Sequence, residues 1–367
     1  MLPEPTTEVD AVDHYVALLA DAGWPGETMC LTVVRGLPVA EALIRFNGEA
    51  TDREVTLVDA GQASTAAFPD ELPLVVADVL DGWVVLAEDN GWNGADLSVL
   101  ARLSEGGTVA ASAYWNVNLL AQVALAHDGE VVGAFDFVID EPPAEGAMEP
   151  FIRGLDFTDA ERMCAAALAF LERVSGVRVP VDWSTRPHPA SVIGRFPWLN
   201  RSGATGWLTD MAPELHAGLS TASDAQVRAV TTLAATWACE TTGVEDPAVL
   251  DTLARDVDTV PAAERAVLRE RLAERTREEY RQALNLRWDH CRPLGLEKIA
   301  ALQGEVSRRN ADRSAEHGSV ARTHAMVAAR GRLMDDPRVG LGLAVANAYQ
   351  IDKPGWPALR DRLTQAL

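Results

Sequence analysis

The chain has 367 residues and a formal net charge of −22, with 48% hydrophobic and 23% charged residues. This composition is typical of a packed globular protein and excludes a disordered polymer. No apolar run approaches the roughly 20 residues that a bilayer span needs. The N-terminal segment has no basic residue before its short apolar run, so it does not resemble a secretory signal. We therefore expect a cytoplasmic protein, and the length predicts two domains or one elaborated domain.

The negative charge is concentrated in the first 150 residues, which carry 26 acidic and four basic side chains. The remaining residues carry 28 of each sign. Such a field repels nucleic acid and anionic membranes, and it attracts cationic partners over about a Debye length. We therefore expect a cationic protein or peptide as the partner, with no binding to nucleic acid or membranes. Solubility in an acidic proteome is the alternative explanation.

The first 140 residues alternate between helical and strand patterns. Apolar residues recur at helical spacing before Gly23, and the Asp128-Gly129 step predicts a tight hairpin. The expected helices cover 10–22, 38–48 and 95–107, and the expected strands cover 29–36, 54–61, 81–91, 108–115, 116–126 and 130–140. Helices between the early strands and a meander at the end predict an α+β domain with a mostly antiparallel sheet.

The composition changes at 141–150, a segment rich in proline and glutamate. A helix is expected at 156–177, with Thr158 and Glu161 forming a capping box. The proline- and tryptophan-rich segment 178–207 is expected to be extended and to wrap around the protein. Helical patterns then dominate, at 224–243, 261–285, 296–334 and 357–367. We therefore divide the chain into an acidic α+β domain (1–140), a linker, packing helix and wrapping segment (141–209), and an all-α domain (210–367).

Several short segments of the N-terminal part occur in the order and spacing of a known family. They are Cys30-Leu31-Thr32, Gly82-Trp83, Asn116-Val117-Asn118 and Ser175-Gly176-Val177. On these segments, residues 10–180 resemble an uncharacterised actinobacterial family, the domain of unknown function 6461. The resemblance implies a cytoplasmic protein and brings no catalytic residue with it.

The usual sequence signatures of metal, cofactor and nucleophile sites are missing. The seven histidines include neither an HxH nor an HExxH pattern, and no Walker, GxSxG or GxGxxG motif occurs. Wide spacing without a CxxC pair favours buried free thiols over disulfides or a zinc site at the four cysteines, Cys30, Cys164, Cys239 and Cys291. We therefore expect no bound metal and no cofactor.

The segment 87–98 is the strongest candidate for a binding loop. From Asp89 it superficially suits a calcium loop, but Gly91 and Leu100 occupy positions where ligands are needed. Trp92 stands among glycine and asparagine turn residues, a setting in which binding surfaces expose tryptophan; Trp198 in the wrapping segment has a similar setting. Core packing is the alternative for both. The candidate partner-binding residues are Trp92 and the three carboxylates near it, Glu88, Asp89 and Asp96.

The helical part offers one alternative with a chemical role. Arg309, followed by His317, approximates the Arg-polar-x-His pattern of HEPN ribonucleases, in which arginine steadies phosphate and histidine transfers protons. A solvated helix face rich in ion pairs explains the same residues. We therefore expect a non-enzymatic interaction protein, such as an immunity-like protein, an adaptor or a conflict-system component. An enzyme with an unrecognised site, with Arg309 and His317 as its catalytic residues, is the alternative.

Overall fold

The computed structural model describes residues 2–6, 10–21, 23–67, 70–194, 208–209, 211–291 and 314–367. The chain forms two compact units. The first contains the residues up to Ile193 and the end of the long helix α11, from Arg287. The second contains Gly194–Leu286 and the C-terminal helices up to Leu367. Among the described residues, no helix is both long and apolar enough to cross a membrane.

The first unit is built on one sheet whose neighbouring strands are all antiparallel, in the order β2-β8-β3-β4-β1-β5-β6-β7. The strands are β1 (Met29–Arg35), β2 (Glu54–Val55), β3 (Leu74–Leu80), β4 (Trp83–Asp89), β5 (Val109–Trp115), β6 (Ala121–His127), β7 (Glu130–Asp136) and β8 (His188–Val192). The four central strands are buried along most of their length, as expected for a sheet covered on both faces.

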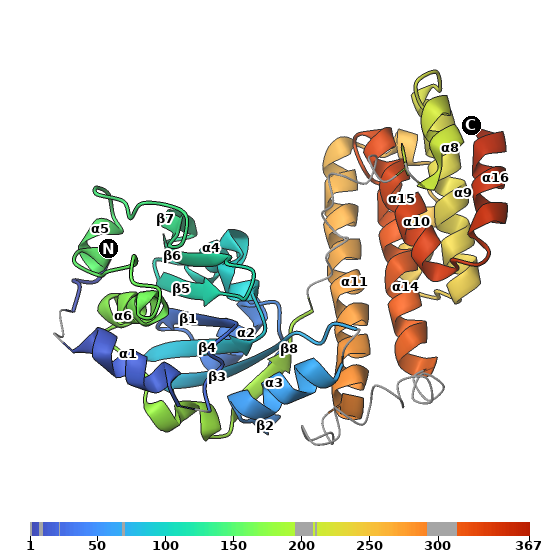
Figure 1. Ribbon diagram of the computed structural model, residues 1–367. Helices are drawn as coiled ribbons and strands as arrows, with labels where there is room; N and C mark the ends of the chain where they lie inside the picture. Colours follow the sequence, from blue (N-terminus) through green and yellow to red (C-terminus); the bar gives the residue numbers. More distant parts are fainter. Residues whose placement is uncertain are drawn as a thin grey trace. The chain divides into compact units, whose positions relative to one another are not determined.

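Helices cover both faces of this sheet (Figure 1). On one face, α1 (Ala11–Leu19) packs on α6 (Met163–Ser175), which contacts β1 and β5, while α3 (Leu57–Ala66) contacts β3 and β4. On the other face, α2 (Val39–Arg45) and α4 (Leu97–Leu103) enclose an apolar core with the inward side chains of the strands. The hairpin predicted at Asp128-Gly129 is confirmed, with positive φ angles of 53° and 84°.

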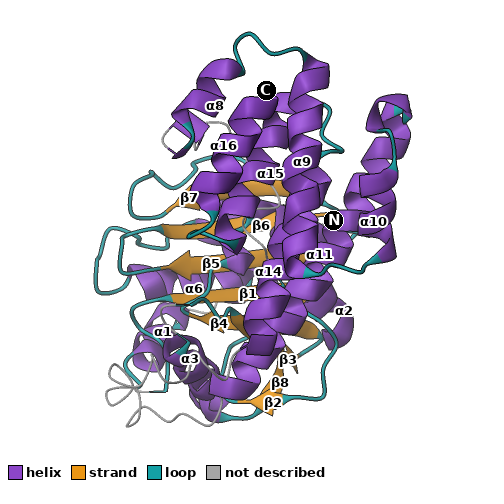
Figure 2. Ribbon diagram, turned by 90° about the vertical axis from the view of Figure 1, so that its right-hand side faces the viewer, coloured by secondary structure: helices purple, strands orange, loops and turns teal. Residues whose placement is uncertain are grey.

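The second unit is helical throughout its described part. Its helices are α8 (Pro213–Gly218), α9 (Asp224–Thr242), α10 (Pro247–Ala254), α11 (Ala262–Cys291), α14 (Ser314–Gly331), α15 (Pro337–Ile351) and α16 (Trp356–Ala366). Figure 2 shows α9, α14 and α15 side by side, and their buried faces form much of the core. Ser223 and Gln226 form a capping box at the start of α9. The predicted architecture, an α+β unit followed by an all-α unit, is confirmed; the boundaries at residues 140 and 209 stay predictions.

The strand predicted at 54–61 is wrong beyond its first two residues. The chain turns into α3 after β2, because the Thr56 side chain accepts a hydrogen bond from the backbone N–H of Asp59 and caps the helix. The alternation of Val55 and Leu57 looked like a strand face. The burial of Leu57, Ala60 and Gly61 instead follows the helical repeat.

The capping box predicted at Thr158 is also wrong. The Thr158 hydroxyl donates to the Asp156 carboxylate at 2.7 Å, and α6 begins later, at Met163, without a side-chain cap. Gly176 ends α6 in the left-handed conformation, with φ of 73°, as a C-terminal glycine cap should.

The segment 178–207 is not entirely a wrapping loop, because it contains β8. This strand lies between β2 and β3. Its proline, Pro189, pairs with Glu54 of β2, whereas pairing with β3 begins only at Ala190. Pro189 therefore leaves the longer ladder intact despite its missing N–H. Residues 195–207 lie outside the described residues, as does the first half of the helix predicted at 296–334.

Candidate functional site

The loop that follows β4 is stabilised by a buried carboxylate, that of Glu88. Glu88 is only 1% exposed, and its two oxygens accept hydrogen bonds from the backbone N–H groups of Asn93 (3.0 Å) and Gly94 (2.9 Å). Such charge-assisted bonds to backbone donors are stronger than neutral ones. Glu88 was a candidate for direct partner contact, and its burial assigns it a supporting role in the loop instead.

Close packing fixes the rest of this loop. A Cβ atom on Gly91 would lie 2.5 Å from a Glu88 carboxylate oxygen, and one on Gly94 would lie 2.1 Å from the Thr32 hydroxyl. The buried Asn93 side chain donates to the backbone carbonyl of Phe46 at 2.7 Å. The loop therefore has little freedom to rearrange.

Trp92 lies on the outside of this rigid loop. Its side chain is 50% exposed, although the residues on both sides of it, Gly91 and Asn93, are buried. An aromatic ring presented by a fixed backbone loses little conformational entropy when a partner covers it. Trp92 has the exposure that a binding anchor needs, and its role as an anchor stays a prediction. Trp198 lies outside the described residues.

Asp89 points to the opposite face of β4 from Glu88, because successive strand residues alternate. Its carboxylate packs directly against Gly61 of α3, where a Cβ atom would lie 1.6 Å from the nearer oxygen. Among the described residues, no side chain or backbone group forms a hydrogen bond or ion pair with it. Burial raises the pKa of Asp89 to about 6. A cation placed beside this carboxylate would oppose the effect of burial and lower the pKa again.

Asp96 closes the loop as the N-cap of α4. Its carboxylate accepts from the backbone N–H of Ser98 at 2.9 Å and from the Ser98 hydroxyl at 2.7 Å. This cap fixes the end of the loop and leaves a partly exposed negative charge beside it. The structure therefore brings Trp92, Asp89 and Asp96 to the end of β4, although Asp89 faces away from Glu88.

The sequence analysis missed a group of exposed apolar side chains at the same end of the sheet. The register places Asp89 of β4, Trp115 of β5 and Asp136 of β7 at the same end of the sheet. The segments that follow these three strands therefore leave the sheet at that end. Ile139 is 75% exposed, and four more exposed apolar residues lie in these segments, Val117, Leu119, Leu120 and Val138. We call these five residues, together with Trp92, the sheet-end surface. Exposed apolar side chains grouped in this way mark interaction sites.

One of these residues is held in an unfavourable backbone conformation. Leu119 has a φ of 62°, a region that bulky residues rarely adopt. The Asn116 side chain stabilises this turn by accepting hydrogen bonds from the N–H groups of Asn118 (2.9 Å) and Leu120 (3.1 Å). Backbone strain that is maintained beside exposed apolar side chains is typical of binding loops. The alternating run Asn-Val-Asn-Leu led to the prediction of a strand over 116–126, which is wrong for 116–120 because β6 begins at Ala121.

The segments around the sheet-end surface carry acidic residues but no basic ones. No lysine or arginine occurs in 86–98, 115–122 or 135–142, whereas acidic residues occur in the first and third of them. Asp136 is engaged locally, since it accepts from the N–H groups of Val138 (2.9 Å) and Ile139 (3.2 Å). The exposed Asp140 and Glu141 follow directly. The surface therefore combines exposed apolar side chains with charge of one sign.

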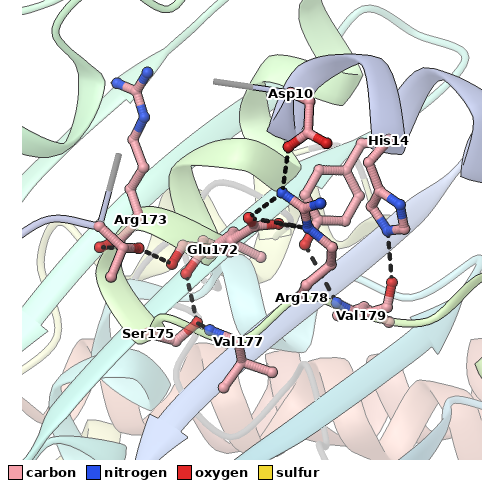
Figure 3. Close-up of polar contacts among 11 residues, drawn as sticks. Asp10, His14, Glu172, Arg173, Ser175, Val177, Arg178 and Val179 are labelled. Carbon is pink, nitrogen blue, oxygen red and sulfur yellow. Dashed lines mark hydrogen bonds and ion pairs between the residues drawn. The ribbon is translucent and has the colours of Figure 1, made fainter. Parts of the chain in front are cut away.

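A second polar cluster of this unit has a structural role (Figure 3). The Arg178 guanidinium lies between two carboxylates, at 2.8 Å from Glu172 and 2.9 Å from Asp10. Glu172 is buried near the end of α6, and His14 of α1 hydrogen-bonds the carbonyl of Val179 at 2.9 Å. These contacts join α1, α6 and the segment after α6. Every charge in the cluster has a partner of opposite sign or a backbone group, so the cluster explains packing rather than ligand binding.

The remaining candidate chemistries gain no support from the described residues. Among them, no group of three histidine, cysteine, aspartate or glutamate side chains could hold a metal ion. The four cysteines are free thiols, and burial raises the pKa of Cys164 to about 11 and of Cys239 to about 12. His317 is exposed on α14, whereas Arg309 lies outside the described residues. The ribonuclease alternative therefore stays a prediction.

Comparison with known families gives one match, over much of the first unit. Residues 11–183 match the model of the Family of unknown function (DUF6461), which confirms the resemblance inferred for residues 10–180. The matched region includes the whole loop around Trp92 and, except for Asp10, the cluster around Arg178. No curated protein and no solved structure matches the chain.

Proposed function

We propose that this protein is a non-enzymatic interaction protein of the cytoplasm that recognises a cationic protein or peptide. The recognition site is the sheet-end surface together with Asp89 and Asp96. In this proposal the protein acts as an immunity-like protein, an adaptor or a conflict-system component. The observation that carries the proposal is Trp92, half-exposed on a loop that buried hydrogen bonds hold rigid.

The apolar part of the site favours a protein or peptide over a nucleic acid. Binding energy at protein interfaces is concentrated in a few aromatic and aliphatic anchors that become desolvated. Trp92, Leu119 and Ile139 are exposed side chains of this kind. A nucleic acid would meet 26 acidic and only four basic side chains in the first 150 residues, and the phosphates would be repelled.

The charge of the site favours a cationic partner. A lysine or arginine of the partner could form an ion pair with Asp89, whose carboxylate has no hydrogen-bond or ion-pair partner among the described residues. Binding would then lower the pKa of Asp89 from its raised value of about 6. The acidic field of the whole unit would also speed the encounter with such a partner, and salt would weaken this effect.

Selection from a random peptide library on the full-length protein tests the proposal. Recovered peptides should be enriched in lysine and arginine alternating with apolar residues. Trp92→Ala should weaken binding of the recovered peptides by about 30-fold, the typical effect of removing an interface anchor of about 2 kcal/mol. The melting temperature of this variant should match that of the wild type, because the ring is not part of the core.

A matched control is Val267→Ala, which truncates an exposed apolar residue of α11 and should leave peptide binding unchanged. Recovered peptides without a cationic bias would contradict the charge part of the proposal. Equal binding by wild type and Trp92→Ala would contradict the assigned site. Unfolding of Trp92→Ala would show that the ring serves the fold.

A further inference from the structure

A cavity of about 200 Å³ lies within the helical unit, between α9, the start of the 3-10 helix at Val257–Thr259, the end of α14 and the first residue of α15. Half of its lining residues have polar side chains. They are Arg228, Thr231 and Thr232 of α9, Asp256 before the 3-10 helix, and Arg332 after α14. The cavity is smaller than the 300–1,000 Å³ of drug-sized ligand sites, so it suits a small molecule or a single chemical group.

The Arg332 side chain is the unusual element of this cavity. It is only 9% exposed, and its guanidinium donates to three neutral oxygens. These are the Thr232 hydroxyl (3.0 Å), the Arg255 carbonyl (3.0 Å) and the Thr252 carbonyl. A guanidinium has five N–H donors, so these bonds account for three of them. Among the described residues, no carboxylate lies within ion-pair distance of Arg332.

A buried cation without an anion in contact is electrostatically costly. Burial accordingly lowers the pKa of Arg332, and the more distant Asp256 only partly opposes this effect. Arg228 adds a second positive charge to the cavity wall. The lining therefore holds two arginines and one carboxylate, an excess of one positive charge in a partly enclosed space.

A second cavity of this unit has a different balance of charge. It measures about 350 Å³, and its two arginines are each paired with a carboxylate. Arg275 lies 3.3 Å from Asp246, and Arg322 lies 2.6 Å from Glu279. Two further carboxylates, Glu245 and Glu278, line that cavity, so its lining has an excess of negative charge, whereas the lining around Arg332 has an excess of positive charge.

We propose that the cavity around Arg332 binds a phosphate-sized oxyanion, with Arg332 and Arg228 as the cationic contacts. Arginine suits this ligand because its planar fork matches the oxygens of phosphate and carboxylate groups. The Thr231 and Thr232 hydroxyls line the same wall but donate to the carbonyls of Val227 (2.8 Å) and Arg228 (2.9 Å), so the arginines are the donors to the anion. The site lies in the helical unit and is independent of the peptide site proposed on the first unit. The anion is either free phosphate or the terminal group of a small phosphate ester.

Calorimetric titration of the full-length protein with inorganic phosphate, at ionic strength matched with chloride, tests this site. Saturable binding at one site is expected. Arg228→Gln should weaken it by about tenfold or more, as expected when a hydrogen bond to a charged group is lost. Asp256→Asn should strengthen it severalfold, because the opposing negative charge is removed. A parallel titration with glycerol phosphate distinguishes the two sources, since tighter binding of the ester favours a phosphate ester and tighter binding of inorganic phosphate favours the free ion.

Arg228 and Asp256 are the informative positions, because a change at Arg332 would also disturb its bonds to the end of α10. Arg360→Gln, at an exposed pair with Asp361 elsewhere in the unit, is the control and should bind phosphate like the wild type. The absence of saturable binding would overturn the proposal. Phosphate affinity that is the same in wild type, Arg228→Gln and Asp256→Asn would overturn it equally.

Discussion

The two units of this protein differ in the partners of their charged side chains. The first unit carries almost no cations in its first 150 residues, and its carboxylates instead bind backbone N–H groups, as Glu88 and Asp136 do. In the helical unit, arginines pair with carboxylates along and between helices, as Arg265 and Arg269 do with Asp335. One unit therefore has an uncompensated negative field, and the other is close to neutral.

This difference predicts where cationic and anionic ligands should bind. A carboxylate that caps a loop or a helix still contributes its full charge to the surrounding field, because a backbone N–H carries only a partial charge. The first unit therefore attracts cations as a whole. In the helical unit the Arg332 guanidinium is buried and, among the described residues, has no carboxylate within ion-pair distance, so it is the candidate for a local anion site.

The largest stability effect is expected where the first unit does use an ion pair. Arg178→Met should destabilise this unit by about 2–3 kcal/mol, because it leaves the buried Glu172 carboxylate without its cation. Methionine keeps much of the aliphatic packing, so the lost charge dominates. Hydrogen exchange of the α1 and α6 amides, measured by mass spectrometry, reports the change in that unit alone.

The comparison is sharpened by the same substitution at an exposed pair of the helical unit. Arg338→Met removes the partner of Asp224, and both side chains of that pair are well exposed. Its cost should stay under about 1 kcal/mol. Equal effects of Arg178→Met and Arg338→Met would show that the two units use their ion pairs alike, and the contrast between them would fail.

Substitution of Asp89 is expected to stabilise the first unit, an effect opposite in sign to that of Arg178→Met. Burial raises the folded-state pKa of Asp89 to about 6 from 3.8, so the unfolded chain releases this proton at lower pH than the folded chain. The ionised carboxylate therefore costs stability as pH rises from about 4 through 6. Asp89→Asn should stabilise the first unit by about 2 kcal/mol near neutral pH, and the gain should vanish below about pH 4.

Chemical denaturation of wild type and Asp89→Asn across this pH range measures the effect, with the exposed Asp52→Asn as control. The same Asp89→Asn variant should bind cationic peptides more weakly, although it is more stable. A variant that is neither more stable nor weaker in binding would show that Asp89 is an ordinary surface carboxylate.

The sequence predicted most of the architecture because the strong patterns were local. The Asp128-Gly129 hairpin and the long periodic helix α9 each depend on a few neighbouring residues. The errors have two causes. At Thr158 a local competitor decides, because the Asp156 carboxylate accepts its hydroxyl, whereas β8 depends on distant contacts, since β2 and β3 lie on both sides of it.

The candidate site was predictable only in part for the same reason. Trp92 and its acidic neighbours are close in sequence, so the loop could be recognised. Side-chain alternation along β4 places Glu88 on the face of the loop and Asp89 on the face of α3. Predicting these two directions from the sequence would have required the exact limits of β4. The apolar residues at 117–120 and 138–139 join the loop only through the strand order, which no local pattern reveals. The cavity around Arg332 likewise gathers residues about 100 positions apart.

The most direct test of the central claim follows the indole signal of Trp92 in the full-length protein by NMR, with Trp92→Phe used to assign it. Two peptides are titrated that share their leucines and differ only in having lysine or glutamate between them. We expect the lysine peptide to shift the Trp92 signal saturably, with an affinity that falls as salt is added, and the glutamate peptide to leave it unchanged. A Trp92 signal that responds to both peptides alike, or to neither, would contradict the account.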